Sequence, residues 1–228
     1  MNYLRYVKII GTMHVSPKSR DEVFRTILKE RPHAVAVELD RARFIGMQQK
    51  IEMTLSDSLR LGRKGVINYV LAKVEEKLGE TFGMAPGEEM TAAIEAARAI
   101  GVPLYLIDED IGLILAKISR APAREKLLMA LESLGVFLPI KAVDIGDPFE
   151  EYRWMMLEFR RRYPYLYRVL VEERNEVMAR NLMMIVDSLL AGGGVKRPKV
   201  VAVVGLGHKP GIERILNRGK TEPVTFIF

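Results

Sequence analysis

Two Gly-x-x-His motifs, far apart in the chain, carry the clearest chemical signal in this sequence. Tyr6–His14 reads YVKIIGTMH and Val200–His208 reads VVAVVGLGH. In both segments an apolar run typical of a strand ends in Gly-x-x-His, and a proline and a helical pattern follow. A neutral imidazole can bind Zn, Mn, Co or Fe, or act as a general base near neutral pH. We therefore interpret His14 and His208 as a functional pair, whereas His33 lacks this context and is expected at the surface.

Two glutamates, one after a predicted strand and one at the start of a predicted helix, could complete such a site. Glu38 follows the apolar run AVAV, and a carboxylate beside a buried strand is costly unless a metal, a cation or hydrogen bonds stabilise it. The alternative to metal binding is a salt bridge to Arg41 or Arg43. Glu89 lies at the start of a predicted helix, where the helix dipole alone favours acidic residues. Two histidines with one or two glutamates would suit a divalent ion such as Mn, Co or Zn, with positions left for water.

A third polar segment, Glu173-Arg174-Asn175, lies in a long helix predicted over about 166–190. Charged neighbours four residues apart, such as Glu172 and Glu176, are typical of a solvent-exposed helix face. From the residues alone, both a surface role and a role in the site remain open for Arg174 and Asn175.

The elements that must position these residues alternate between strands and helices. Apolar, β-branched runs predict strands over about 5–10, 34–39, 103–107, 199–204 and 224–228, and helical patterns cover about 17–29, 88–100 and 210–217. This alternation predicts an α/β fold with a mostly parallel central sheet of about five or more strands flanked by helices. The segment from about 112 to 190 has helical patterns and no convincing strand, so we expect a large helical insertion there. A smaller helical insert is expected over about 42–78.

The strand directions predict where the chemistry gathers. Polar residues follow four of the predicted strands, at 11–14, at 38 and 40, at 108–110 and at 205–208. The carboxyl ends of parallel strands share one edge of a sheet, and ligands of open α/β sheets bind beyond that edge. We therefore expect these residues to line one crevice. The sequence contains no phosphate-binding P-loop, no dinucleotide fingerprint and no G-x-S-x-G nucleophile elbow.

Length and composition exclude several classes of protein. The 228 residues suit a single α/β domain spanning 1–228, and the absence of cysteine excludes disulfides, thiolate metal sites and cysteine nucleophiles. No apolar run approaches the ~20 residues of a membrane span. We therefore expect a soluble, cytoplasmic protein with no membrane partner. The net charge is +6, but the basic residues are dispersed and no recognition motif accompanies them, so no nucleic-acid partner is expected.

Six motifs along nearly the whole chain resemble the TraB/PrgY pheromone-shutdown family. They follow in the family's order: GTMHVSPKSRDEV at 11–23, VAVELDRAR at 35–43, GEEM at 87–90, LIDEDI at 106–111, ERNEVMARNL at 173–182 and VVAVVGLGHKPGI at 200–212. The family is similar to the TIKI proteases and GumN-like proteins, and more distantly to erythromycin-esterase-like and ChaN-like proteins.

The resemblance implies a divalent-metal hydrolase site with paired histidines and a glutamate, and peptides as substrates in the TIKI branch. Carried over by position, it implies site roles for His14, Glu38, Glu89, Arg174, Asn175 and His208. The chain departs from the family at Glu109, where a basic residue is usual. It also lacks the membrane segments into which many microbial members continue.

These observations lead to one main hypothesis and two alternatives. We expect a metal-dependent hydrolase of peptide-like substrates, with His14, His208 and Glu38 as metal ligands and Glu89 moving the proton. Arg174 would bind the oxyanion or a substrate carboxylate. The alternatives are a metal-independent His/Glu esterase and a non-catalytic protein that binds peptides and inhibits signalling. The partner would be a peptide or small-molecule substrate. The aromatic residues of the helical insertion would suit either a lid over the crevice or a homodimer surface.

Overall fold

Four parallel strands form the centre of the fold. The computed structural model describes residues 1–12, 17–49, 88–133 and 147–219. Within them the strands are β1 (Val7–Thr12), β2 (Ala34–Val37), β3 (Leu104–Leu106) and β4 (Val200–Gly205), in the spatial order β1-β4-β2-β3. All three pairings are parallel, as the alternation of strands and helices predicts.

The described sheet has fewer strands than the five or more that the sequence suggests. Four of the predicted strands are present, with bounds shifted by up to two residues, and the predicted strand at 224–228 lies outside the described residues. Arg5, predicted to begin the first strand, belongs instead to a short 3-10 helix, η1 (Tyr3–Arg5). The α/β class and the parallel sheet are confirmed.

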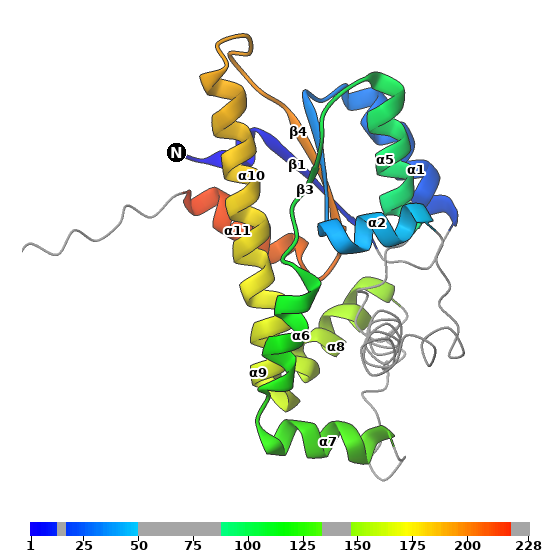
Figure 1. The fold of residues 1–228 in the computed structure, drawn as a ribbon, viewed down its shortest axis with the longest axis vertical. Helices are drawn as coiled ribbons and strands as arrows, with labels where there is room; N and C mark the ends of the chain where they lie inside the picture. Colours follow the sequence, from blue (N-terminus) through cyan, green and yellow to red (C-terminus); the bar gives the residue numbers. More distant parts are fainter. Residues whose placement is uncertain (13–16, 50–87, 134–146, 220–228) are drawn as a thin grey trace, which may run out of the picture.

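Helices cover both faces of the sheet (Figure 1). On one face lie α1 (Pro17–Glu30) and α5 (Glu88–Ile100), packed on a core that includes Val35, Val37, Val201 and Val203. On the other lie α10 (Arg174–Ala191) and α11 (Lys209–Arg218), packed on Ala34, Ala36, Val200, Ala202 and Val204. Successive side chains of a strand point to opposite faces, so β2 and β4 are apolar throughout because both of their faces are buried.

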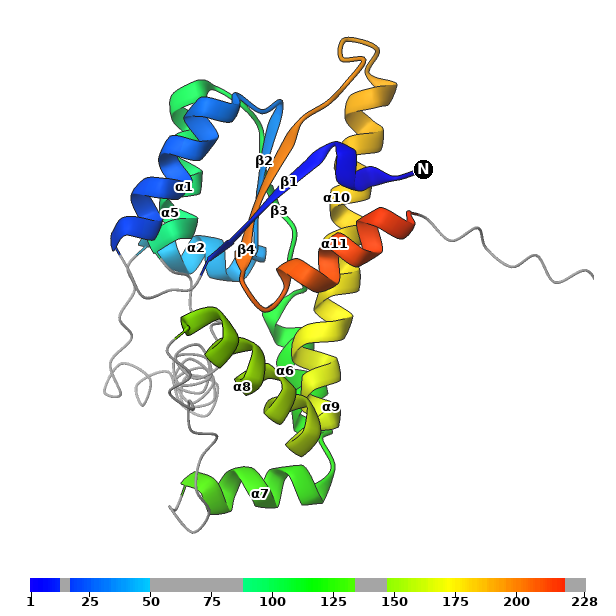
Figure 2. The ribbon, with the colours of Figure 1, turned by 180° about the vertical axis from the view of Figure 1, so that it is seen from behind.

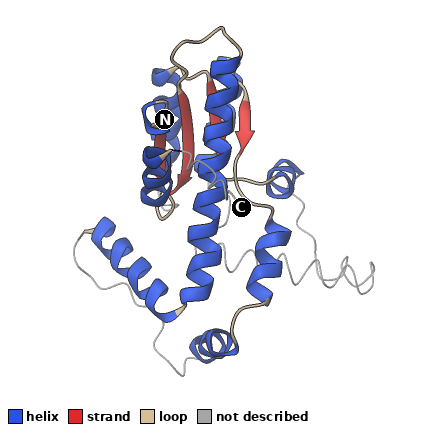
Figure 3. Cartoon of the chain, turned by 90° about the vertical axis from the view of Figure 1, so that its left-hand side faces the viewer, coloured by secondary structure: helices blue, strands red, loops and turns tan. Residues whose placement is uncertain are grey.

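The helical insertion extends beyond the sheet. It comprises α6 (Ile111–Ser119), α7 (Ala123–Ser133), α8 (Pro148–Arg162), α9 (Pro164–Tyr167) and a π-helical turn, η2 (Arg168–Glu173), which leads into α10. Aromatic and aliphatic residues of α6, α8, α9 and η2 form a separate core that includes Ile114, Phe159 and Leu166. Figure 2 and Figure 3 show helices alone in this part of the molecule, and strands only above it.

Two predicted helices differ from the structure in detail. The helix predicted over 166–190 is three consecutive segments, α9, η2 and α10, because the π turn interrupts it directly before Arg174. Of the insert predicted over 42–78, only α2 (Arg41–Gln49) lies within the described residues. None of the described helices combines the length and the apolar character that a bilayer span requires.

Candidate functional site

The carboxyl ends of β1, β4 and β2 bring Gly11 and Thr12 of the first motif, the second motif and Glu38 to one edge of the sheet. Gly11 pairs with Val204 and Thr12 with Gly205, so the two Gly-x-x-His segments leave neighbouring parallel strands at almost the same level. Glu38 directly follows β2 on the other side of β4, and its backbone N–H donates to the Val203 carbonyl at 3.0 Å. The shared edge that strand direction predicts is therefore present.

His208 is buried at this edge, where its two ring nitrogens have different partners. Nδ1 lies 2.8 Å from the Asn175 side-chain oxygen, and Nε2 lies 3.3 Å from Glu38 Oε1. An amide oxygen only accepts hydrogen bonds, so this contact assigns the proton of the neutral imidazole to Nδ1 and leaves a lone pair on Nε2. Burial lowers the pKa of His208 by more than Glu38 raises it, which favours the neutral ring.

Arg174 contacts the same oxygen of the Glu38 carboxylate as His208 does. Its guanidinium is 1% exposed, and Nη2 donates to Glu38 Oε1 at 2.5 Å. The other carboxylate oxygen of Glu38 accepts the Gly205 backbone N–H at 2.7 Å. Both oxygens of Glu38 are thus fixed by donors from α10 and β4.

The remaining nitrogens of Arg174 also have protein partners. Nε donates to Asp108 Oδ1 at 3.0 Å, Nη2 to Asp108 Oδ2 at 2.6 Å, and Nη1 to the Leu170 carbonyl within η2 at 3.1 Å. Burial alone would lower the pKa of Arg174, but Asp108 and Glu38 raise it above its ordinary value. These contacts favour a role in positioning Glu38 over the substrate contact that the sequence suggests for Arg174.

Asp108 connects Arg174 to a second arginine. Arg43 of α2 donates through Nη2 to Asp108 Oδ2 and through Nε to Asp40 Oδ2, the latter at 2.5 Å. Asp40 also caps α2, since its Oδ1 accepts two backbone N–H groups of the first turn. The suggested salt bridge from Glu38 to Arg41 or Arg43 is not formed, because Asp40 and Asp108 engage Arg43 while Glu38 pairs with Arg174.

This buried charge cluster, Glu38, Asp40, Arg43, Asp108 and Arg174, has an excess of negative charge. Among the described residues, three carboxylates face two guanidinium groups, which leaves one net negative charge in the cluster when His208 is neutral. The arginines hold the pKa of Asp108 well below its usual range although burial opposes this, so Asp108 stays ionised. An uncompensated buried charge is costly, and a cation beside Glu38 would balance it.

Two glycines after β4 are required by side chains that pack against them. A methyl group at Gly211 would overlap the amide of Asn175, and one at Gly207 would overlap the hydroxyl of Tyr152 from α8. The Asn175 amide therefore lies directly against the backbone of Gly211 in α11, and the Tyr152 hydroxyl lies directly against the backbone of Gly207 in the second motif, so that a side chain at either glycine would displace them.

The structure brings together four of the six predicted site residues: Glu38, Arg174, Asn175 and His208. None of these contacts involves Glu89, which is buried in the first turn of α5. His14 lies outside the described residues. His33 is exposed, and its Nδ1 accepts the Lys199 backbone N–H at 3.0 Å at the opposite end of the strands, which confirms its expected surface position.

The donor atoms of His208 and Glu38 fit a shared divalent ion. Zinc bonds of about 2.0–2.2 Å to nitrogen and oxygen at the tetrahedral angle place the two donors ~3.4 Å apart. The observed separation of Nε2 and Oε1 is 3.3 Å. The described residues contain no group of three His, Cys, Asp or Glu side chains arranged to hold a metal ion, so a third protein ligand would come from the rest of the chain.

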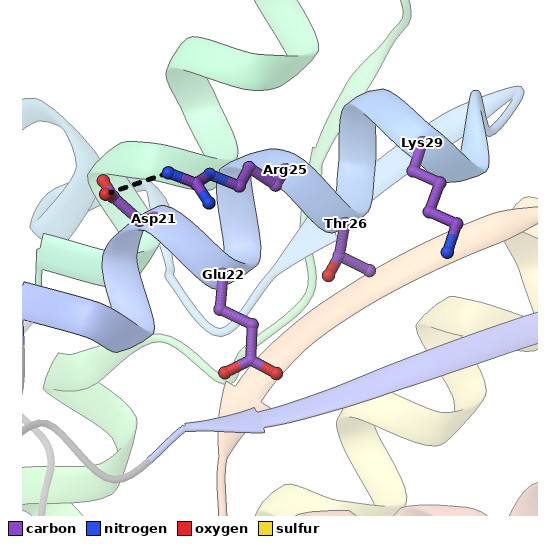
Figure 4. Close-up of a pocket in the computed structure, with 5 residues that line it drawn as sticks. All are labelled: Asp21, Glu22, Arg25, Thr26 and Lys29. Carbon is purple, nitrogen blue, oxygen red and sulfur yellow. Dashed lines mark ion pairs between the residues drawn. The ribbon is translucent and has the colours of Figure 1, made fainter.

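Two hollows among the described residues lie away from this edge. One, of about 410 Å³, runs along α1 and is lined by Asp21, Glu22, Arg25, Thr26 and Lys29 (Figure 4). The other, of about 760 Å³, lies near the amino ends of β1 and β4 and is lined mainly by Arg5, Lys8, Glu30, Arg197 and Lys199. Exposed ion pairs such as Asp21–Arg25, 3.8 Å apart, explain the first as an ordinary helix surface.

Sequence reasoning missed one residue of the site and the pairing of two others. Asp108 was expected at this edge because it follows a predicted strand, and Arg43 was considered only as a partner of Glu38. Their ion pairs with each other and between Asp108 and Arg174 were not predicted. Tyr152 carries no local signal, because only the fold of α8 brings it to Gly207.

Comparison with known proteins places the chain among related sequences. Residues 4–225 match the TraB/PrgY/gumN family. An uncharacterized protein of Methanocaldococcus jannaschii is 34% identical over 220 residues, which cover 93% of this chain and 53% of that protein. A TraB domain-containing protein of Homo sapiens is 30% identical over 236 residues, which cover 91% of this chain and 62% of that protein. The chain therefore spans between about half and three fifths of the length of these relatives.

Proposed function

This chain belongs to the TraB/PrgY/gumN family, and we propose that it is a divalent-metal-dependent hydrolase of peptide-like substrates. One observation carries the proposal. His208 Nε2 and Glu38 Oε1 converge to 3.3 Å beside a buried cluster that has one excess negative charge. A lone pair and a carboxylate oxygen at this separation, in surroundings that favour a cation, suit a divalent ion.

The donor set indicates which ions fit. His208 and Glu38, joined by His14 of the first motif, would hold the ion, and imidazole with carboxylate suits Mn, Co or Zn. When bound, the ion would lower the pKa of a coordinated water and polarise the scissile carbonyl of the substrate.

The chain's own residues orient the two donors before any ligand arrives. Asn175 fixes the ring of His208 through Nδ1, which directs Nε2 toward Glu38. Arg174 and the Gly205 backbone hold the two oxygens of Glu38. Arg174 is thus a positioning residue in this proposal. Glu89, buried at the amino end of α5, is the carboxylate proposed to move the proton between water and the leaving group.

A second candidate is a metal-independent hydrolase that uses the same pair. It is favoured by the His208–Glu38 contact itself, because a neutral imidazole 3.3 Å from a carboxylate could accept a proton from water and share the resulting charge. The two candidates differ in one observable, the survival of turnover after exhaustive chelation.

The test begins with protein purified without chelators. Its metal content is analysed, the binding of Mn²⁺, Co²⁺ and Zn²⁺ is measured by calorimetry, and a peptide library is screened with each ion. We expect one high-affinity site and metal-dependent cleavage. Loss of a residue that only hydrogen-bonds to a metal ligand weakens metal binding by roughly 10–100-fold. His208→Ala and Glu38→Gln each remove a proposed ligand itself, so each should weaken metal binding by more than this. His33→Ala, which alters the exposed histidine at the opposite end of β2, is the matched control and should bind as the unmodified chain does.

Three results would decide against the proposal. Turnover that survives exhaustive chelation would favour the metal-independent candidate. Saturable peptide binding without product in the presence of each ion would favour the peptide-binding protein that the sequence left open. Equal metal affinity in Glu38→Gln and the unmodified chain would place the ion elsewhere.

A further inference from the structure

Tyr152 of α8 reaches the backbone of the second motif at the residue that precedes His208. Its hydroxyl packs against Gly207, one residue before His208 and two after Gly205, whose N–H holds Glu38. A Cβ at Gly207 would also come within 3.2 Å of Met156, one helical turn further along α8, so α8 lies beside this glycine. The helical insertion thus presents one polar group at the backbone of the second Gly-x-x-His motif.

The hydroxyl retains a proton that it can donate. The backbone of Gly207 hydrogen-bonds to the phenolic oxygen, so the oxygen acts as the acceptor in that contact. A phenol that accepts one hydrogen bond still carries its own O–H. Tyr152 can therefore donate to a group that lies beside Gly207.

The proposed hydrolase needs such a donor, and Arg174 does not supply it. Negative charge develops on the carbonyl oxygen of a substrate during hydrolysis, and a preorganised donor stabilises it. Each guanidinium nitrogen of Arg174 already donates to Glu38, Asp108 or Leu170. Four of the five N–H groups of Arg174 thus already donate to protein acceptors, and the side chain is 1% exposed, which favours another group as the oxyanion donor.

We propose that Tyr152 is a catalytic residue whose phenolic O–H donates a hydrogen bond to the carbonyl oxygen of the substrate as that oxygen becomes negative. This inference rests on the proposed function and assigns to α8 a part in the chemistry of the sheet edge. It also explains why the second motif has glycine at its variable position 207, since a side chain there would displace the hydroxyl.

The protonation state of Tyr152 agrees with this role. Burial and the nearby charge of Glu38 raise the pKa of the phenol to about 12, although the Gly207 hydrogen bond opposes the shift. The group is therefore a neutral donor throughout the neutral pH range.

The main competing explanation is structural, because the same contact could simply clamp α8 onto the sheet. The two roles make different predictions. A clamp affects folding stability and every property of the site together, whereas an oxyanion donor affects the transition state and its analogues alone.

The experiment compares Tyr152→Phe with a matched control, Tyr165→Phe. Tyr165 lies in the same helical insertion, and its hydroxyl donates to the Lys117 carbonyl at 3.1 Å, so both variants lose one phenolic hydrogen-bonding group. The measurements are kcat and KM for the best-cleaved library peptide, Mn²⁺ affinity, melting temperature, and affinity for a phosphinic pseudopeptide of the same sequence. The phosphinic group mimics the tetrahedral, negatively charged transition state.

We expect Tyr152→Phe to lower kcat by about 10²–10³-fold, the cost of removing one oxyanion donor, with KM changed little. Affinity for the pseudopeptide should fall while Mn²⁺ affinity and melting temperature stay close to those of Tyr165→Phe. Gly207→Ala, which keeps the phenol but displaces it, should lower kcat and pseudopeptide affinity in the same way.

Each contrary result has a distinct meaning. Unchanged kcat and pseudopeptide affinity in Tyr152→Phe would overturn the role of Tyr152 and leave the metal site intact. Parallel loss of Mn²⁺ affinity and melting temperature would overturn it in favour of a clamp. If the unmodified chain neither binds Mn²⁺ nor cleaves any peptide, the proposed function fails, and the role of Tyr152 fails with it.

Discussion

Replacing Arg174 by methionine tests whether this side chain holds the buried carboxylates together. The substitution keeps an unbranched side chain but removes four hydrogen bonds, two of which join Asp108 and one Glu38. Removing one partner of a buried ion pair costs about 3–5 kcal/mol because the other charge is left uncompensated. Gly205 still donates to Glu38 and Arg43 still pairs with Asp108, so we expect the lower end, about 3 kcal/mol.

This loss is measurable as a shift in thermal unfolding. For a domain of this size, 1 kcal/mol corresponds to roughly 2–4 °C, so Arg174→Met should lower the melting temperature by roughly 6–12 °C. Arg161→Met is the control, because Arg161 pairs with Glu158 on an exposed helix face and its removal should have little effect.

A double-mutant cycle sharpens the result. If Arg174 and Asp108 are directly coupled, Arg174→Met combined with Asp108→Asn should be less destabilised than the sum of the single variants by at least about 1 kcal/mol. A loss below about 1 kcal/mol in Arg174→Met, with additive double-mutant behaviour, would refute the network and restore Arg174 as a candidate substrate contact.

Three further predictions follow from individual contacts. Gly211→Ala should displace the Asn175 amide and weaken metal binding by calorimetry by about 10–100-fold, as loss of a ligand's orienting partner does; wild-type affinity would exclude that role. The pKa of Asp108 is lowered on folding from 3.8, so its stabilising contribution is present above that pH and is lost as the pH falls below it. Urea titrations should therefore show the stability gap between the unmodified chain and Asp108→Asn shrinking below about pH 4, and a constant gap would contradict this. Glu125→Gln should lower the urea midpoint, because the buried carboxylate accepts two backbone N–H groups of α9 at 3.0 Å each, and an unchanged midpoint would show that these bonds do not stabilise α9.

The layout of the sheet was predictable because its physical signals are local. The runs Ala34–Val37 and Val200–Gly205 are short, apolar and β-branched, which is typical of strands buried on both faces. Helix α5 begins and ends at the predicted residues, since its acidic first turn and the following glycine mark both ends. Parallel strand direction then placed Glu38 and the second motif at one edge without any tertiary information.

The partners within the site were less predictable, because pairing depends on the packing of distant elements. Arg174 was ambiguous in sequence since its helix also carries ordinary surface charges, and the π turn that precedes it has no composition signal of its own. The sequence offered a nearby arginine, Arg41 or Arg43, as the alternative to metal binding by Glu38, but the arginine that pairs with Glu38 lies 136 residues away. The place of Tyr152 beside the second motif could not be predicted for the same reason, because it depends on how α8 packs against the sheet.

The most direct test of the proposed metal site is anomalous diffraction from crystals grown with Mn²⁺ or Zn²⁺. We predict a single strong anomalous peak between His208 Nε2 and Glu38 Oε1, with a third protein donor from the first Gly-x-x-His motif, and no peak there in Glu38→Gln crystals. An ion bound only elsewhere in the chain, or an empty position between these two atoms at saturating metal, would contradict the proposal.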